Sequence, residues 1–134
     1  MSFNWLEYLV IAQELTAKAA TSPIQEASLR SAISRAYYAA IHKAQDHLAY
    51  KDNSPIPYPV NIHFYIVTEF ENSKDETRKK IGALLHHLRS IRNIADYQDT
   101  FFGNLQGRTQ GVLLEAEEIF RLLDTLSSPP PNER

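Results

Sequence analysis

Apolar residues recur at helical spacing between residues 81 and 95, and one arginine lies inside their stripe. At about 100° per residue, a single helix face collects Ile81, Leu84, Leu85, Leu88, Ile91 and Ala95. Arg92 falls on the same face. A guanidinium keeps its charge, so burying it without a partner is costly. Arg92 therefore has a buried partner, faces another chain, or lines a polar cleft that binds an anionic group.

Helical periodicity also dominates the rest of the chain, and no segment has a convincing strand pattern. The apolar spacing predicts helices over residues 5–20, 23–50, 60–71, 74–97 and 112–126. The sum is an all-α fold, an antiparallel up-and-down bundle of four long helices plus one short helix. We expect a single domain over residues 1–126, because a chain of 134 residues suits one hydrophobic core.

The ends of these helices carry their own signals. The capping-box pattern, a small polar residue followed three positions later by Glu or Gln, occurs at Asn4–Glu7, Ser22–Gln25 and Ser73–Glu76. Alternating prolines at positions 55, 57 and 59 predict an extended loop, and the glycines within 98–111 predict a second loop. Residues 127–134, rich in proline, should form a disordered tail. The inward face expected for the first helix consists of Leu6, Leu9, Val10, Gln13, Ala17 and Ala20.

Bulk composition narrows the classes of function. The formal net charge is -2, which argues against a nonspecific nucleic-acid binder and predicts no DNA partner, although it leaves room for a local basic site. The sequence has no cysteine, which excludes thiolate metal sites and thiol nucleophiles. No apolar run approaches the roughly 18 residues of a membrane span, and the first ten residues lack the basic start of a signal peptide. We therefore expect a cytoplasmic protein with no membrane partner.

Two groups of polar residues are candidates for a site. Arg89, Arg92 and Asp96 lie along one helix edge, because residues three or four apart are neighbours on a helix. One interpretation is a structural ion pair between Arg92 and Asp96. The other is a phosphate site, because the planar guanidinium fork matches phosphate oxygens. The second helix has a further polar stripe, suited to RNA contact or to a solvated face, made of Ser31, Arg35, Tyr38 and His42.

The histidines do not predict a metal site. A di-metal site in a helical bundle uses Glu-x-x-His pairs on two helices, and no glutamate here is followed by histidine at that spacing. His86 and His87 are adjacent, so they point about 100° apart on a helix and cannot chelate one ion together. We expect neither a metal nor another cofactor.

Two motifs make the sequence similar to one prokaryotic group of HEPN-domain proteins. The run SRAYYAA at Ser34–Ala40 resembles the Arg-Ala-Tyr-Tyr-Ala run in the second helix of that group. The segment Leu88–Tyr97 resembles its signature Leu-x-x-x-Arg-x-x-Ala-Asp-Tyr, and the matching positions are Arg92, Ala95, Asp96 and Tyr97. Both motifs occur in the same order and on the expected helices, so the resemblance spans about residues 5–126.

The resemblance implies a helical bundle that dimerises, with the second motif near the dimer cleft. Many HEPN proteins are metal-independent ribonucleases, and several are toxins paired with a nucleotidyltransferase-like antitoxin. Their catalytic signature is an arginine, often followed by asparagine, and then a histidine. Arg92 and Asn93 match its start, whereas Tyr97 and Gln98 occupy the positions of the histidine. A tyrosine with a pKa of about 10 is a poor general base at neutral pH.

Three hypotheses follow. The first is a HEPN module that homodimerises and binds RNA, a nucleotide or a protein partner at a cleft around Arg92, without the usual catalysis. The second is a ribonuclease toxin in which Arg92 stabilises the transition state and Tyr97, Asp96, His42 or His63 replaces the missing base. The third is a structural or scaffold bundle. The candidate residues are Arg92, Asn93, Asp96 and Tyr97 for catalysis, and Arg35, Tyr38, His42 and Arg89 for binding RNA or a nucleotide.

Overall fold

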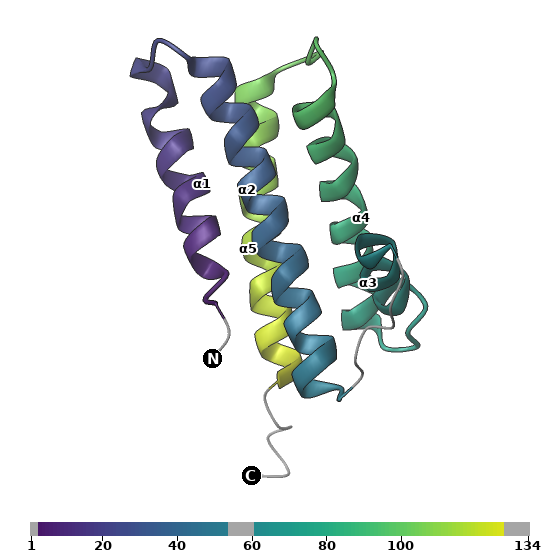
Figure 1. Cartoon of the computed structure of the whole chain (residues 1–134). Helices are drawn as coiled ribbons and strands as arrows, with labels where there is room; N and C mark the ends of the chain where they lie inside the picture. The colour runs from purple at the N-terminus through teal and green to yellow at the C-terminus, as the bar shows by residue number, and fades with distance from the viewer. Residues whose placement is uncertain (1–2, 54–60, 128–134) are drawn as a thin grey trace.

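The computed structural model describes residues 3–53 and 61–127 of the chain, and the regular structure within them is entirely helical (Figure 1). The five α-helices are α1 (Leu6–Lys18), α2 (Gln25–Asp46), α3 (Ile62–Glu71), α4 (Glu76–Tyr97) and α5 (Leu105–Ser127). A 3₁₀ turn (Ala19–Thr21) extends α1, and a π-helical turn (His47–Lys51) extends α2. The all-α prediction is confirmed, including the helix expected over residues 60–71.

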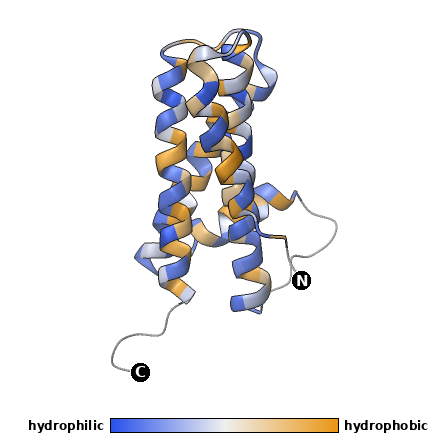
Figure 2. Ribbon diagram, turned by 90° about the vertical axis from the view of Figure 1, so that its left-hand side faces the viewer, coloured by the Kyte–Doolittle hydropathy of each residue, from blue (hydrophilic) through white to orange (hydrophobic). Residues whose placement is uncertain are grey.

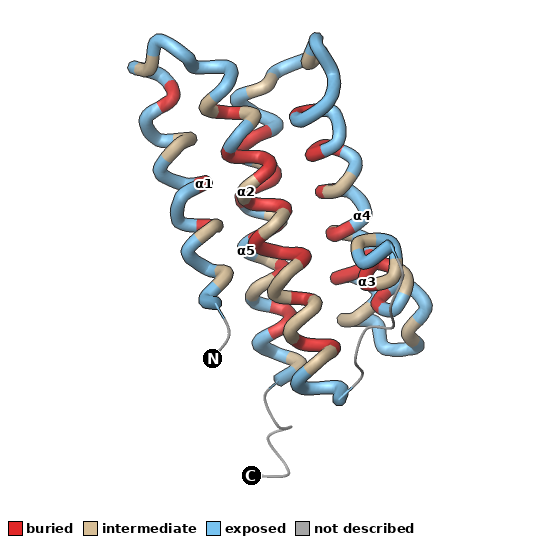
Figure 3. Tube along the Cα trace, viewed as in Figure 1, coloured by how far each residue is buried: buried red, intermediate tan, exposed pale blue. Residues whose placement is uncertain are grey.

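The four helices α1, α2, α4 and α5 lie side by side, and the short α3 covers one end of α4 (Figure 1). Helix α2 is central, because it packs against α1, α4 and α5. Its alanines permit this close approach, and the fully buried ones are Ala32, Ala36, Ala39, Ala40 and Ala44. Figure 3 shows the buried residues of α2, α4 and α5 facing one another, and Figure 2 shows hydrophobic and hydrophilic residues alternating along each helix.

The stripe expected on α4 is confirmed, with Leu84 half-buried. The buried residues of α4 are Ile81, Gly82, Leu85, Leu88, Ile91, Arg92 and Ala95. Arg92 is only 7% exposed, so the arginine does lie within the apolar face. Helix α3 closes against α4 at Gly82, where an added Cβ would lie 2.6 Å from the backbone nitrogen of Glu71.

The face predicted for α1 is rotated. The buried residues are Leu9 and Ala12, whereas Leu6 and Val10 remain 45% and 43% exposed. Helix α1 lies at the edge of the bundle, where it packs against α2 and, less extensively, α5. A narrow stripe is therefore enough to attach α1, and the rest of its apolar side stays exposed.

Local hydrogen bonds explain where the other predicted boundaries differ. Helix α4 is capped by Asp75, whose Oδ2 accepts from the backbone N–H of Arg78 at 2.9 Å, and not by Ser73. Helix α2 begins at Gln25, because Ser22 accepts from the N–H of Ile24 in a turn that precedes the helix.

Two further boundaries shift at the ends of the chain's long helices. Helix α1 begins at Leu6, with Trp5 and not Asn4 in the cap position, although the Asn4 side chain accepts from the N–H of Leu6. Helix α5 begins at Leu105, inside the predicted 98–111 loop, because Asn104 Oδ1 accepts from the N–H of Gly107 and stabilises the first turn.

Some predictions fall on parts of the chain that are not described. The alternating prolines 55, 57 and 59 and most of the proline-rich tail lie outside the described residues. Within the described residues, no helix has the length and apolar character needed to cross a membrane.

Candidate functional site

Arg92 lies in an aromatic cradle between α2 and the end of α4. Its Cζ is 5.0 Å from the ring centroid of Tyr37, 5.3 Å from that of Tyr38 and 5.8 Å from that of Tyr97. The first two rings come from the Arg-Ala-Tyr-Tyr-Ala run, so the two motifs identified in the sequence meet here. Cation–π attraction to several rings stabilises a desolvated guanidinium, which explains how the charge is held in an apolar stripe.

The polar partners of Arg92 are few. Its Nη1 lies 3.5 Å from Oδ2 of Asp96, which also accepts a hydrogen bond from the Ser34 hydroxyl at 3.2 Å. Within the described residues, the buried Nε of Arg92 has no hydrogen-bond partner. The predicted Arg92–Asp96 pair is therefore present, but it is long, and Asp96 keeps 26% of its side chain exposed.

His63, at the start of α3, joins this cluster through Tyr37. The Tyr37 hydroxyl and the His63 Nδ1 are 2.6 Å apart. Helix α3 begins just before this residue because Asn61 Oδ1 accepts from the N–H of Phe64. A histidine from a separate helix thus approaches the arginine motif, which has no histidine at its own downstream positions.

The electrostatics of the pair fix its protonation at neutral pH. Burial raises the pKa of Tyr37 to about 12, and the opposing effect of Arg92 and Arg89 is smaller. Burial lowers the pKa of His63, and the positive charges of Arg92 and Arg89 lower it further. Tyr37 is thus protonated and His63 neutral, and the imidazole tautomer decides which of the two groups donates in this contact.

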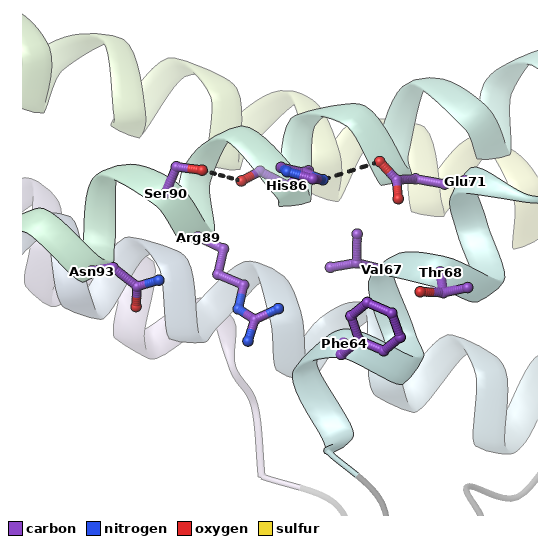
Figure 4. Close-up of a pocket in the computed structure, with 8 residues that line it drawn as sticks. All are labelled: Phe64, Val67, Thr68, Glu71, His86, Arg89, Ser90 and Asn93. Atoms are coloured by element: carbon purple, nitrogen blue, oxygen red, sulfur yellow. Dashed lines mark hydrogen bonds and ion pairs between the residues drawn. The ribbon is translucent and has the colours of Figure 1, made fainter.

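Arg89 lies one turn before Arg92 and lines a pocket of about 210 Å³ between α3 and α4 (Figure 4). Its guanidinium extends between Asn93 and Phe64 in that view. Within the described residues, Arg89 forms no ion pair and no hydrogen bond, although its Nε is buried. Its charge also acts on Tyr37 and His63. Two guanidinium groups, those of Arg89 and Arg92, therefore act on Tyr37 and His63.

A second, more open groove of about 470 Å³ lies between α2 and the end of α4. Arg35 and Tyr38 line it together with Asp96, as expected if these residues approach one another across the two helices. The Arg35 guanidinium lies 5.4 Å from the Tyr38 ring and 5.0 Å from the Tyr8 ring. Tyr38 thus separates the groove from buried Arg92.

Arg30, on α2, has a structural role at this end of α4. Arg30 donates to the backbone carbonyls of Ala95, Gln98 and Asp99, which closes the carboxyl end of the helix. It also forms an ion pair with Glu26 at 3.0 Å. Arg30 is therefore a structural cap, whereas Arg89 and Arg35 line the two pockets described above.

The other sequence candidates have distinct positions. His42 stacks on Trp5, with ring centroids 3.8 Å apart, so it packs α2 against the residue before α1. Burial lowers its pKa. Asn93 lines the α3–α4 pocket beside Arg89, and Tyr97 is 73% exposed at the end of α4. Within the described residues there is no cluster of three or more metal-ligating side chains.

Sequence reasoning missed Phe64, the pair of Glu71 and His86, and the position of His63. Phe64 and Glu71 line the same pocket as Arg89 (Figure 4). The cap at Asn61 was a usable signal for the start of α3, but no local pattern shows which helix α3 packs against.

Comparisons with models of protein families, with curated proteins and with solved structures find no match. The similarity to HEPN proteins therefore rests on the two motifs.

Proposed function

We propose that the chain is a HEPN-like antiparallel helical module that binds phosphate groups of RNA or of a nucleotide beside Arg89 and Arg92. One observation carries the proposal, namely that Arg89 is partly buried with no ion pair and no hydrogen bond among the described residues. A guanidinium without a hydrogen-bond partner is matched by a phosphate or by another group that offers two adjacent acceptors.

RNA is favoured over a simple anion because aromatic rings surround the cations. Phe64 is 62% exposed beside Arg89, and Tyr38 lines the groove with Arg35. Stacking rings next to arginines are typical of surfaces that bind unpaired bases and their phosphates. A cytoplasmic location and a prokaryotic origin belong to the same proposal.

Homodimerisation is part of this proposal, and exposed apolar residues support it. Arg92 and the alanines of α2 pack inside the chain, so they do not indicate a partner. Apolar residues at the end of α4 do, because Ile94, Tyr97 and Phe102 are 40%, 73% and 83% exposed. Light scattering at micromolar concentration tests the dimer, and a monomer would contradict it.

A metal-independent ribonuclease, as in a toxin paired with a nucleotidyltransferase-like antitoxin, is the second candidate. The contact between His63 and Tyr37 favours it, because it places an imidazole with lowered pKa near two guanidiniums. In that reaction a base removes the ribose 2′-hydroxyl proton, the oxygen attacks the adjacent phosphorus, and the 5′-oxygen leaves with a proton. We place binding ahead of catalysis, because Tyr97 and Gln98 occupy the histidine positions of the arginine motif.

The deciding experiment measures binding of mixed-sequence RNA by fluorescence anisotropy in EDTA. We expect Arg89→Ala to weaken binding about tenfold and to lower the salt dependence by about one phosphate contact. The matched control is Arg108→Ala, an exposed arginine on α5, which should change affinity much less. Equal affinities for the two variants would contradict the proposal.

The same samples test the catalytic alternative on a gel. RNA cleavage by the wild-type protein that is lost in Arg92→Ala and in His63→Ala would establish the ribonuclease. If the protein binds RNA without cleaving it, the ribonuclease hypothesis is wrong and the binding hypothesis stands. If neither binding nor cleavage occurs, the scaffold hypothesis is the better explanation.

A further inference from the structure

The pocket between α3 and α4 has two chemically different ends (Figure 4). At one end lie the Arg89 guanidinium and the Asn93 amide. At the other end Glu71 forms an ion pair with His86, with 3.2 Å between Oε2 and Nδ1. A donor-rich end therefore faces a carboxylate end across an apolar middle.

An aromatic ring and an apolar side chain form this middle. Phe64 presents an exposed ring, and Val67 is buried beside it. The volume of about 210 Å³ is below the 300–1,000 Å³ typical of sites for drug-sized ligands. The pocket therefore suits one planar ring system stacked on Phe64, and it is too small for two stacked nucleotides.

We infer that this pocket binds a single guanine base, with the base stacked on Phe64, its acceptor edge at Arg89 and its donor edge at Glu71. This inference rests on the proposed RNA or nucleotide function and names the base that the site selects. Guanine offers two adjacent acceptors, O6 and N7, which match an arginine fork. The guanidinium has five N–H donors, so a remaining donor of Arg89 can still contact the phosphate. Its N1–H and amino group are donors that the second carboxylate oxygen of Glu71 accepts.

The other bases complement the pocket less well. Adenine has an amino donor in place of O6, so it would direct that donor at the Arg89 guanidinium. The pyrimidines lack the N7 and O6 pair that arginine contacts in a bidentate manner. The pocket thus distinguishes the bases by their hydrogen-bond donors and acceptors. Stacking on Phe64 adds affinity for any base.

Two contacts fix the position of Glu71 at its end of the pocket. Gly82 lets α3 approach α4, since an added Cβ would lie 2.7 Å from Cγ of Glu71. His86 contacts one carboxylate oxygen of Glu71, and the side chain of this glutamate remains 39% exposed. The other oxygen is therefore free to accept from a ligand.

The test compares the RNA heptamers UUUGUUU, UUUIUUU and UUUAUUU, where I is inosine, by fluorescence anisotropy, together with guanosine and adenosine monophosphates. We expect the guanosine heptamer to bind about five- to 150-fold more tightly than the adenosine heptamer, the discrimination of one bidentate pair. Inosine, which lacks the amino group, should be intermediate. If only the free guanosine monophosphate shows the preference, the ligand is a free nucleotide and the guanine site stands.

Variants separate this inference from the proposed function. Glu71→Gln should remove most of the preference for guanosine over adenosine, and Phe64→Ala should weaken both heptamers about tenfold or more. Tyr50→Ala, which removes an exposed aromatic ring outside the pocket, should change neither. Equal binding of both heptamers that still depends on Arg89 would overturn the guanine site and leave the RNA function intact. No binding of any probe would overturn both.

Discussion

Replacing Arg92 with alanine tests whether its cradle stabilises the fold. The side chain is 7% exposed and contacts three tyrosine rings. Removing a large buried side chain costs about 2–5 kcal/mol, and the lost cation–π contacts add about 1–2 kcal/mol. Against this, the variant no longer buries an Nε without a hydrogen-bond partner, which returns about 1–3 kcal/mol. The net expectation is a loss of about 3 kcal/mol.

For a domain of this size, 1 kcal/mol shifts the melting temperature by about 4 °C, so Arg92→Ala should melt about 10 °C below the wild-type protein. The assay is thermal unfolding followed by far-UV circular dichroism. Arg92→Met is the matched control, because it keeps much of the apolar stem and removes only the charge. It should recover at least half of the lost stability while the affinity for RNA stays reduced. A melting temperature of Arg92→Ala within about 2 °C of wild type would refute the reasoning.

Three further outcomes follow from individual contacts. Tyr37→Phe removes the hydrogen bond to His63 and should lower the free energy of unfolding by about 1 kcal/mol, measured by urea denaturation; an unchanged midpoint would contradict this. Gly82→Ala places a Cβ against the backbone of Glu71, so overpacking of about 1–3 kcal/mol should exceed the gain of about 1 kcal/mol in helix propensity; a raised melting temperature would show that α3 can move away. The pKa of His63 is lowered in the folded state, so its neutral form stabilises the fold above about pH 6.5 and this contribution is lost as the pH falls through the folded pKa. The drop in melting temperature between pH 7.5 and pH 5 should therefore be smaller in His63→Gln than in wild type, and equal drops would exclude this effect.

The local parts of the fold were predictable from sequence, because helical periodicity depends only on neighbouring residues. The α4 stripe and the inclusion of Arg92 within it follow from spacing alone, and the structure buries both. The early start of α5 was missed because Gly107 and Gly111 indicate a loop. The cap from Asn104 outweighs the weak helix propensity of these glycines.

The relation between α3 and α4 was not predictable. His63 and Phe64 lie near Arg89 and Arg92 because α3 packs against α4 where Gly82 permits close approach. A single glycine has no periodic signature that specifies a partner helix. The sequence therefore predicts only part of the candidate site. The arginine motif is local, whereas tertiary packing brings His63 and Phe64 to it.

Arg89 and Arg92 show how this packing separates two similar residues on one helix. Arg92 points towards α2, where tyrosine rings and Asp96 surround it, and its charge adds to burial in lowering the pKa of His63. Arg89 points towards α3, where it lines a pocket and its Nε has no hydrogen-bond partner among the described residues. If Arg92 positions the site and Arg89 binds the ligand, then Arg92→Lys should lower stability more than Arg89→Lys, and Arg89→Lys should weaken RNA binding at unchanged stability. Both lysine variants keep the positive charge but lose the bidentate fork of the guanidinium. Weaker RNA binding by Arg92→Lys at unchanged affinity of Arg89→Lys would assign the ligand contact to the buried arginine.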